Sequence, residues 1–232
     1  TLYQSGLRGA RGAVMVLSPE HFDYNDMQAY TQARDYKREF PGARGFGLII
    51  KVEPNQTAAF LDRMAAERPS YNFQIRQLTP HQDSLFVITY IEPEQNNREA
   101  VGLDIGSEAM RRKAALDAAF NNDVRLTAAS TLVQANERAQ QGFLMLMPVY
   151  KTTTVPQDSR QRLEHLFGWS YAPILINEVL NSVAGLENDV FLQISDITEQ
   201  TPIEFLKIDN ILDSEGIKKI TELTAISCPF LS

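Results

Sequence analysis

Apolar residues in the first forty positions recur at helical spacing. Leu7 and Val14 fall on one face of a helix that the pattern predicts over residues 1–17. Residues 24–40 are polar with tyrosine and phenylalanine interspersed, and the Pro-Gly pair that follows ends this pattern. We therefore predict a helical stalk over residues 1–40.

After residue 41 the pattern changes to short apolar runs that alternate with helical segments. Strands are predicted at residues 45–52, 72–78, 85–91, 126–134, 142–150, 168–172, 190–197 and 204–208. Helices are predicted at residues 56–68, 107–120, 160–167 and 174–183. Because the strands follow one another in hairpin-like pairs without strict β-α-β alternation, the fold class predicted is α+β with an antiparallel sheet.

Composition excludes several classes of protein. The chain has 232 residues, of which 44% are hydrophobic, and a net charge of −7. This composition is typical of a folded protein with one or two domains and excludes disorder. The acidic balance argues against binding to a phosphate backbone, so no nucleic-acid partner is expected. No run approaches the roughly 18–20 apolar residues that a membrane-spanning helix needs.

Catalytic and metal-binding signatures are missing from the sequence. The one cysteine, Cys228, cannot form an internal disulfide or a zinc site alone. The three histidines stand apart, and the chain lacks the H-E-x-x-H, G-x-S-x-G, P-loop and G-x-G-x-x-G motifs. We predict no catalytic residue, no metal and no cofactor. A carboxylate pair assembled by the fold is invisible in sequence, so a soluble enzyme with a carboxylate site stays an alternative.

Residues 90–150 carry an ordered series of short motifs. They are Tyr90-Ile-Glu-Pro93, Asn97, Ala100-Val-Gly-Leu-Asp104, Ser107-Glu108, Arg111-Arg112, Leu126-Thr127, Gly142-Phe143 and Pro148-Val-Tyr150. Their order and spacing resemble the CHASE domain, the ligand-sensing extracytoplasmic module of bacterial and plant membrane receptors. The resemblance covers about residues 41–185. Within the series, Asn97 and Asp104 are predicted to satisfy backbone groups of turns.

The resemblance implies an arrangement in a longer protein. A stalk helix rises from a transmembrane segment and leads into two PAS-like subdomains, a membrane-distal one at residues 41–185 that binds ligand and a membrane-proximal one at residues 186–232. A second transmembrane helix then leads to a cytoplasmic histidine kinase, diguanylate cyclase, phosphodiesterase or adenylate cyclase. Since residue 1 is threonine, we expect the chain to be a fragment of a membrane-tethered protein on the periplasmic or extracellular face.

The resemblance also bears on the ligand. Plant members of the family bind cytokinins and hold the adenine-like ring with an acidic residue on the helix after the Leu-Asp motif. A gap-free comparison places Arg111 at that acidic position and Leu146 where those receptors carry a threonine. One polar contact is replaced by an apolar residue and the other is reversed in charge, so cytokinin is not the expected ligand.

The arginine suggests a different ligand. With Ser107 as N-cap, Arg111 would follow the first helical turn, where free N–H groups favour an anion. A guanidinium adds a planar fork suited to carboxylate or phosphate. We therefore predict a small anionic ligand clamped by Arg111. The apolar residues predicted to line its site are Ile105, Val133, Leu146, Trp169 and Ala172. In the alternative interpretation, Arg111 is a surface residue or the ion-pair partner of Glu92, Glu108 or Asp104.

These patterns lead to one functional prediction with two rivals. We predict a sensor domain that converts ligand occupancy into a change of geometry in a homodimeric receptor. The small residues Gly6, Gly9, Ala10 and Ala13 form the predicted dimer seam on the stalk, or pack against the chain's own proximal subdomain. The rivals are an ectodomain that binds another protein and the soluble enzyme mentioned above.

Overall fold

A single large sheet organises most of the chain. The computed structural model describes residues 2–40, 42–128, 130–132, 140–175, 191–196 and 203–209. Within them an eight-stranded sheet has the order β2-β4-β3-β1-β8-β7-β5, with β6 paired to β7. Its strands are β1 (Phe46–Val52), β2 (Arg76–Gln77), β3 (Leu85–Glu92), β4 (Leu103–Asp104), β5 (Arg125–Leu126), β6 (Ser130–Leu132), β7 (Gln140–Tyr150) and β8 (Leu166–Leu175). Apart from the parallel β2–β4 pair, neighbouring strands are antiparallel, which confirms the predicted α+β class.

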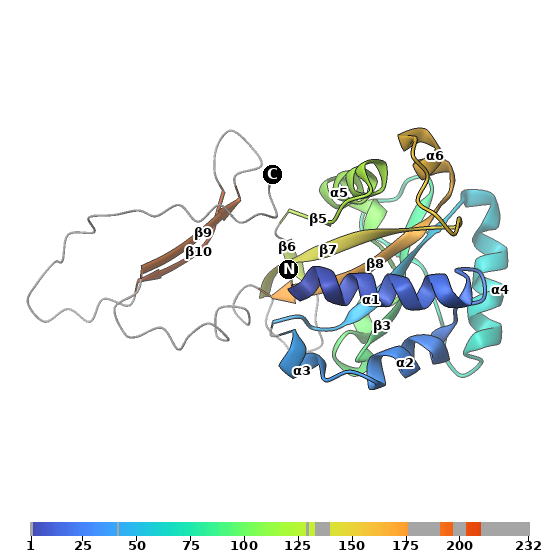
Figure 1. Cartoon of the computed structure of the whole chain (residues 1–232), viewed down its shortest axis with the longest axis horizontal. Helices are drawn as coiled ribbons and strands as arrows, with labels where there is room; N and C mark the ends of the chain where they lie inside the picture. The colour runs from blue at the N-terminus through green and yellow to red at the C-terminus, as the bar shows by residue number, and fades with distance from the viewer. Residues whose placement is uncertain are drawn as a thin grey trace, which may run out of the picture.

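Helices cover both faces of this sheet. They are α1 (Leu2–Leu17), α2 (Tyr24–Gln32), α3 (Tyr36–Glu39), α4 (Thr57–Glu67), α5 (Ala109–Asn121) and α6 (Ser159–Glu164). The long α1 crosses β1, β7 and β8 on one face, whereas α5 covers β5 and β7 on the other (Figure 1). The sheet is therefore buried on both sides, which explains why β1 is apolar nearly throughout.

Two hydrophobic cores result, one on each face of the sheet. Alternation along β1 sends Leu48 and Ile50 to one core and Ile49 to the other. We call them the α1-side core and the α5-side core. Principal members of the α1-side core are Leu7, Val14, Phe46, Leu48, Ile50 and Ala172. Principal members of the α5-side core are Ile105, Ala115, Leu146, Trp169 and Tyr171.

The small residues of α1 allow this helix to lie close to the sheet. A Cβ atom at Gly6 would stand 2.5 Å from Cζ of Phe46, and Ala10 is buried. Part of the predicted dimer seam is thus covered by the chain's own sheet. Packing of the seam against residues 186–232 stays a prediction. On the outer face of α1, Val16 is 84% exposed. Dimerisation itself stays a prediction.

Several element boundaries differ from those predicted. Helical structure in residues 24–40 is divided between α2 and α3, and the strand predicted at 72–78 shrinks to β2. Where a helix was predicted from residue 174, β8 continues to Leu175. Its last residues pair with β7, Ile174 opposite Phe143 and Leu175 opposite Gly142, and this pairing overrides local helical preference. Residues 176–183 lie outside the described residues.

A second, two-stranded sheet follows in the sequence. Strand β9 (Phe191–Asp196) pairs antiparallel with β10 (Ile203–Asp209), which confirms the strands predicted at 190–197 and 204–208. The division into a stalk, a distal subdomain and a proximal subdomain stays a prediction.

Candidate functional site

The start of α5 is capped differently from the prediction. Glu108, not Ser107, is the N-cap, and its carboxylate accepts hydrogen bonds from the backbone N–H groups of Met110 and Arg111, both at 2.9 Å. Ser107 lies in the preceding 3-10 turn, where its hydroxyl donates to the carbonyl of Asp104. Because the chain's own carboxylate occupies the anion-favouring helix end, the helix-dipole argument for a bound anion is wrong.

Arg111 is nevertheless a buried cation. It is only 7% exposed, so it is not the surface arginine of the alternative interpretation. Its Nε lies 4.0 Å from Oε2 of Glu108, in agreement with the predicted ion pair to that residue. Burial lowers the pKa of Arg111, and the charge of Glu108 opposes this. Because buried charged groups with shifted pKa values are concentrated at functional sites, this position is a candidate for ligand contact.

Three of the five predicted lining residues lie in one core, and the structure does not place the other two there. Ile105, Leu146 and Trp169 are each 0% exposed in the α5-side core. Ala172 belongs to the α1-side core, because side chains alternate along β8 and Trp169 already faces α5. Val133 lies outside the described residues.

Two side chains tie α5 to the sheet and define its direction. The indole Nε1 of Trp169 donates to the carbonyl of Ala115 at 2.9 Å, and the phenol of Tyr150 donates to the carbonyl of Ala119 at 2.8 Å. Tyr150 is paired with Leu166, at the beginning of β8. Helix α5 therefore runs antiparallel to β8.

This direction places Arg111 at the same end of the α5-side core as Tyr171. Arg111 lies one helical turn before Ala115, and Tyr171 lies two residues after Trp169, so both displacements are about 6 Å along the same axis. Tyr171 is fully buried and its hydroxyl has no hydrogen-bond partner in the described part of the chain. Burial raises the pKa of Tyr171 well above its ordinary value. A buried hydroxyl without a partner is rare in native proteins and needs an explanation.

A second polar cluster centres on Asp104, whose side chain is completely buried. Its Oδ1 accepts from the backbone N–H groups of Phe86 and Gly106, at 2.8 and 2.9 Å. Its Oδ2 lies 2.7 Å from Nε2 of His81 and accepts from the amide of Gln77 at 3.2 Å. The predicted backbone role of Asp104 is confirmed. Its bond to His81 could not be predicted, since 23 residues separate the two.

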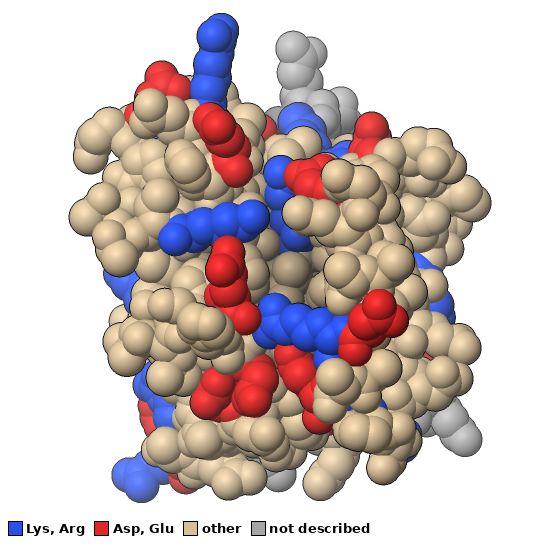
Figure 2. All heavy atoms as spheres, turned by 90° about the vertical axis from the view of Figure 1, so that its right-hand side faces the viewer, with Lys and Arg blue, Asp and Glu red and all other residues tan. Residues whose placement is uncertain are grey.

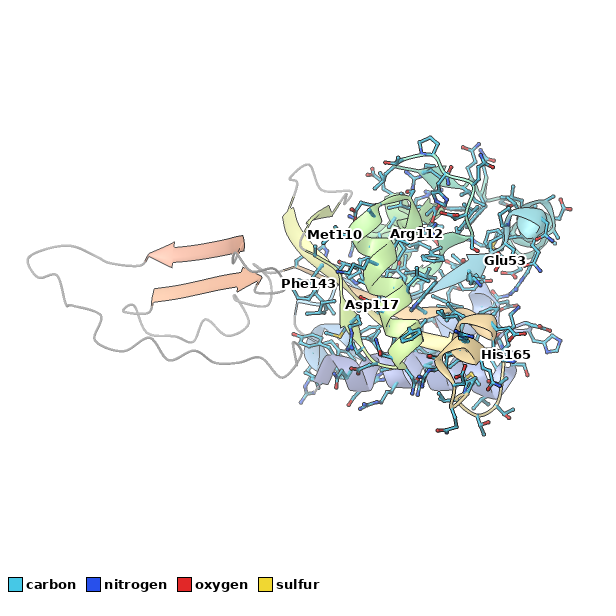
Figure 3. All side chains as sticks on the ribbon, turned by 90° about the horizontal axis from the view of Figure 1, so that it is seen from above. Glu53, Met110, Arg112, Asp117, Phe143 and His165 are labelled. Atoms are coloured by element: carbon cyan, nitrogen blue, oxygen red, sulfur yellow. The ribbon has the colours of Figure 1, made fainter. Side chains whose placement is uncertain are left out.

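Arg112 links this cluster to the α5-side core. It projects from α5 toward the segment before β3 (Figure 3) and donates to the carbonyls of Gly106 and Ser84, at 2.7 and 2.8 Å. Its guanidinium lies 4.5 Å from the ring centre of Phe86, and that ring lies 4.6 Å from Trp169. A continuous stack of side chains therefore joins the Asp104 cluster to the predicted ligand-lining residue Trp169.

Two cavities stand out in the described part of the chain. The larger, about 600 Å³, has Leu61, Phe73, Gln77, His81 and Asp83 among its lining residues. The smaller, about 410 Å³, is lined by residues around Tyr71 and Arg98. Neither cavity is lined by a predicted site residue. Figure 2 shows acidic and basic side chains interspersed over the face that carries α4, without a patch of one sign.

Among the described residues, no helix is both long enough and apolar enough to cross a membrane. The same residues contain no group of three or more histidine, cysteine or acidic side chains placed to hold a metal ion.

Comparison with known proteins identifies the family. A search of curated protein sequences gave no significant match. A family model described as the CHASE domain matches residues 20–206, which is most of the chain and extends beyond the motif series on both sides. This family comprises sensory, not catalytic, domains of signalling receptors, and they are generally extracellular or periplasmic. The chain belongs to the CHASE domain family.

Proposed function

We propose that this CHASE domain is the extracytoplasmic small-molecule sensor of a transmembrane receptor whose output is a histidine kinase or a cyclic-dinucleotide enzyme. The ligand is proposed to bind in the α5-side core. The observation that carries this proposal is the fully buried Tyr171 hydroxyl, which has no hydrogen-bond partner among the described residues and lies at the same end of the core as Arg111. A ligand would supply the missing partner.

The side chains at this end suggest the chemistry of the ligand. The guanidinium of Arg111 can donate two parallel hydrogen bonds to a carboxylate, and the phenol of Tyr171 can donate a third. Ile105, Leu146 and Trp169 would contact an apolar body. A small carboxylate fits this set of donors. Cytokinin does not, because Arg111 occupies the position that holds the adenine-like ring through an acidic residue in the plant receptors.

A route from this core to the membrane follows from the packing of α1. Ser170, between Trp169 and Tyr171 on β8, points to the opposite face and donates to the carbonyl of Leu7 at 3.1 Å. A ligand that displaced β8 or α5 would therefore act on α1 through the same strand. The ligand can shift the receptor only by its difference in affinity for two states. We propose that α1 relays this shift in a homodimer on the periplasmic or extracellular face, and that both subdomains are PAS-like.

A thermal-shift screen of the purified chain against carboxylates, amines and purines tests the proposal. Ligand at ~100 times its Kd adds about 2.7 kcal/mol to stability, enough for a shift of several degrees. We expect a carboxylate to bind, and Arg111→Met to weaken its binding at least tenfold. Arg111→Met keeps an unbranched side chain of similar length and removes the guanidinium, and its thermal unfolding without ligand shows whether the fold is kept. Arg125→Ala is the control, because Arg125 is a partly exposed arginine in β5 that pairs with Asp123.

The outcomes separate the parts of the proposal. Carboxylate binding that stays within twofold in Arg111→Met would show that Arg111 is not the clamp. Binding of an amine or purine in this core would support the sensor function and contradict the proposed carboxylate ligand. Binding that is lost equally in Arg125→Ala would indicate a general electrostatic effect.

One observation favours a second candidate function, an ectodomain that binds another protein. Ile105, Leu146 and Trp169 are packed to 0% exposure, and the larger cavities lie elsewhere. On the outer face of α5, Met110 and Phe120 are 43% and 44% exposed. Two results together would support this function over the first. No metabolite in a broad screen would raise the melting temperature, and Met110→Asp would abolish the binding of a protein partner.

A further inference from the structure

The larger cavity has the size and the walls of a small-molecule site. It lies between α4, the extended residues 73–77 and the loop at residues 81–83. Its volume of about 600 Å³ falls in the range of roughly 300–1,000 Å³ that is usual for ligand pockets. Leu61, Phe73 and Ile75 contribute half-buried apolar surface, which a ligand would remove from water.

The charge of the cavity selects among ligands. Asp83 contributes an exposed carboxylate, and among the described residues that line the cavity none is lysine or arginine. Gln74 and Gln77 add amide groups that can both donate and accept hydrogen bonds. A cationic or neutral ligand is therefore favoured over an anion.

Two contacts hold the His81 ring in the wall of the cavity. Its Nδ1 lies 3.2 Å from the backbone N of Asp83, and its Nε2 lies 2.7 Å from Oδ2 of Asp104. The one carboxylate among the described residues that line the cavity is that of Asp83, since Asp104 and Arg112 do not line it. Asp83 is therefore the acidic group that a ligand in the cavity meets.

We propose that this cavity binds a small organic amine with an apolar body. The ammonium group lies beside the carboxylate of Asp83, and the body packs on Leu61, Phe73 and Ile75. This is a second site, with lining residues different from those of the Arg111 site and opposite in ligand charge. Only its coupling to α5, through His81 and Arg112, rests on the sensor function proposed above.

Three probes of equal size test the charge preference directly. Titration calorimetry uses the 232-residue Arg111→Met chain, in which the carboxylate site proposed above is removed. The probes 2-phenylethylamine, 2-phenylethanol and phenylacetate then compare a cation, a neutral molecule and an anion on one apolar body. We expect the amine to bind most tightly and phenylacetate most weakly. Equal affinity for the three, tighter binding of phenylacetate, or no binding of the amine would overturn the proposal.

Charge reversal at the cavity rim locates the site. Asp83→Lys should weaken 2-phenylethylamine at least fivefold and make phenylacetate the tighter of the two. Asp62→Lys is the matched control, because Asp62 is an exposed residue of α4 outside the cavity lining. It should change each affinity by less than twofold. Equal effects of the two variants would overturn the site, because they would show that affinity follows only the net charge of the protein. Failure here leaves the Arg111 proposal standing, since carboxylates and Arg111 variants test that site separately.

Discussion

The two faces of the sheet solve the same packing problem with different side chains. Beneath α1 the core is largely apolar, and the buried hydroxyls there have partners. Those of Thr31 and Ser170 donate to the carbonyls of Met27 and Leu7, and the phenol of Tyr90 donates to the carboxylate of Glu67. The α5 side holds a buried carboxylate, a buried guanidinium and a phenol without a partner, from Asp104, Arg111 and Tyr171 respectively.

This difference suggests which face carries function. Apolar side chains hold α1 to the sheet, and the one charged group beside them, Arg11, is only half-buried and donates to the carbonyl of Pro148. The fold therefore does not require a fully buried charge to pack a helix. Charged and partnerless polar groups cost free energy in a core and are concentrated at functional sites in many proteins. We infer that the α1 side holds the fold together and that the α5 side is the face adapted for ligands.

The largest expected effect is on the α5 side, at Asp104. Asp104→Ala leaves the N–H groups of Phe86 and Gly106 and the His81 ring without their acceptor, and should lower the free energy of unfolding by about 4 kcal/mol. Urea unfolding measures this loss. Asp104→Asn keeps an acceptor for the two backbone groups and should cost about half as much. A loss below ~1 kcal/mol for the alanine variant would contradict the central role of this carboxylate.

The next effect concerns the α1 side, at the fully buried Leu7. Leu7→Ala removes apolar contacts and leaves a cavity, so it should cost about 3 kcal/mol in urea unfolding. Val16→Ala, at an exposed position of the same helix, should stay within about 0.5 kcal/mol. The fluorescence of Trp169, the one tryptophan of the chain, should change in Asp104→Ala but not in Leu7→Ala. The same change of fluorescence in both variants would contradict the conclusion that the two faces of the sheet differ.

Two tyrosines within the α5-side core sharpen the comparison, because the same substitution should have opposite signs. Tyr171→Phe removes a buried hydroxyl without a partner and should stabilise the protein by about 1 kcal/mol. Tyr150→Phe removes the hydrogen bond to the carbonyl of Ala119 and should destabilise it by about 1 kcal/mol. Thermal unfolding of the matched pair measures both. Destabilisation by Tyr171→Phe would show that its hydroxyl has a favourable partner and would remove the main support for ligand binding there.

The smallest effect is a pH dependence that is also due to Tyr150. Burial raises the pKa of Tyr150 to about 12, from 10.0 in an exposed tyrosine. The unfolded state therefore loses this proton first as the pH rises, and stability declines between about pH 10 and pH 12. At pH 10.5 the loss of stability due to Tyr150 is less than about 1 kcal/mol. Tyr150→Phe should abolish this loss, whereas the losses due to other buried tyrosines should remain. Equal slopes for parent and variant between pH 9 and pH 10.5 would contradict the raised pKa.

Prediction from sequence succeeded where local pattern and final structure agree. The strand at residues 45–52 is found as β1 and the helix at 56–68 as α4, each within one residue at either end. It failed at Ile174, where pairing with β7 overrode helical propensity. It also failed at Ala172, which lies three residues after Trp169 on β8 and therefore faces the opposite core. At the site, Ile105, Leu146 and Trp169 lie in one core, whereas their contact with a ligand and that of Arg111 stay predictions. The N-cap was misplaced by one residue. Ser107 is the better cap by residue preference, but its hydroxyl bonds to the carbonyl of Asp104 in the preceding turn, and Glu108 caps the helix instead.

The sequence by itself determined the α+β class, the acidic surface charge and the CHASE motif series, since each depends on composition, periodicity or the order of short motifs along the chain. Only the tertiary structure decided that Arg111 is buried, that Tyr171 lacks a partner, and that His81 faces Asp104 beside a cavity. The physical reason is that burial, hydrogen-bond satisfaction and charge pairing are properties of groups brought together across tens of residues, and no local pattern encodes them.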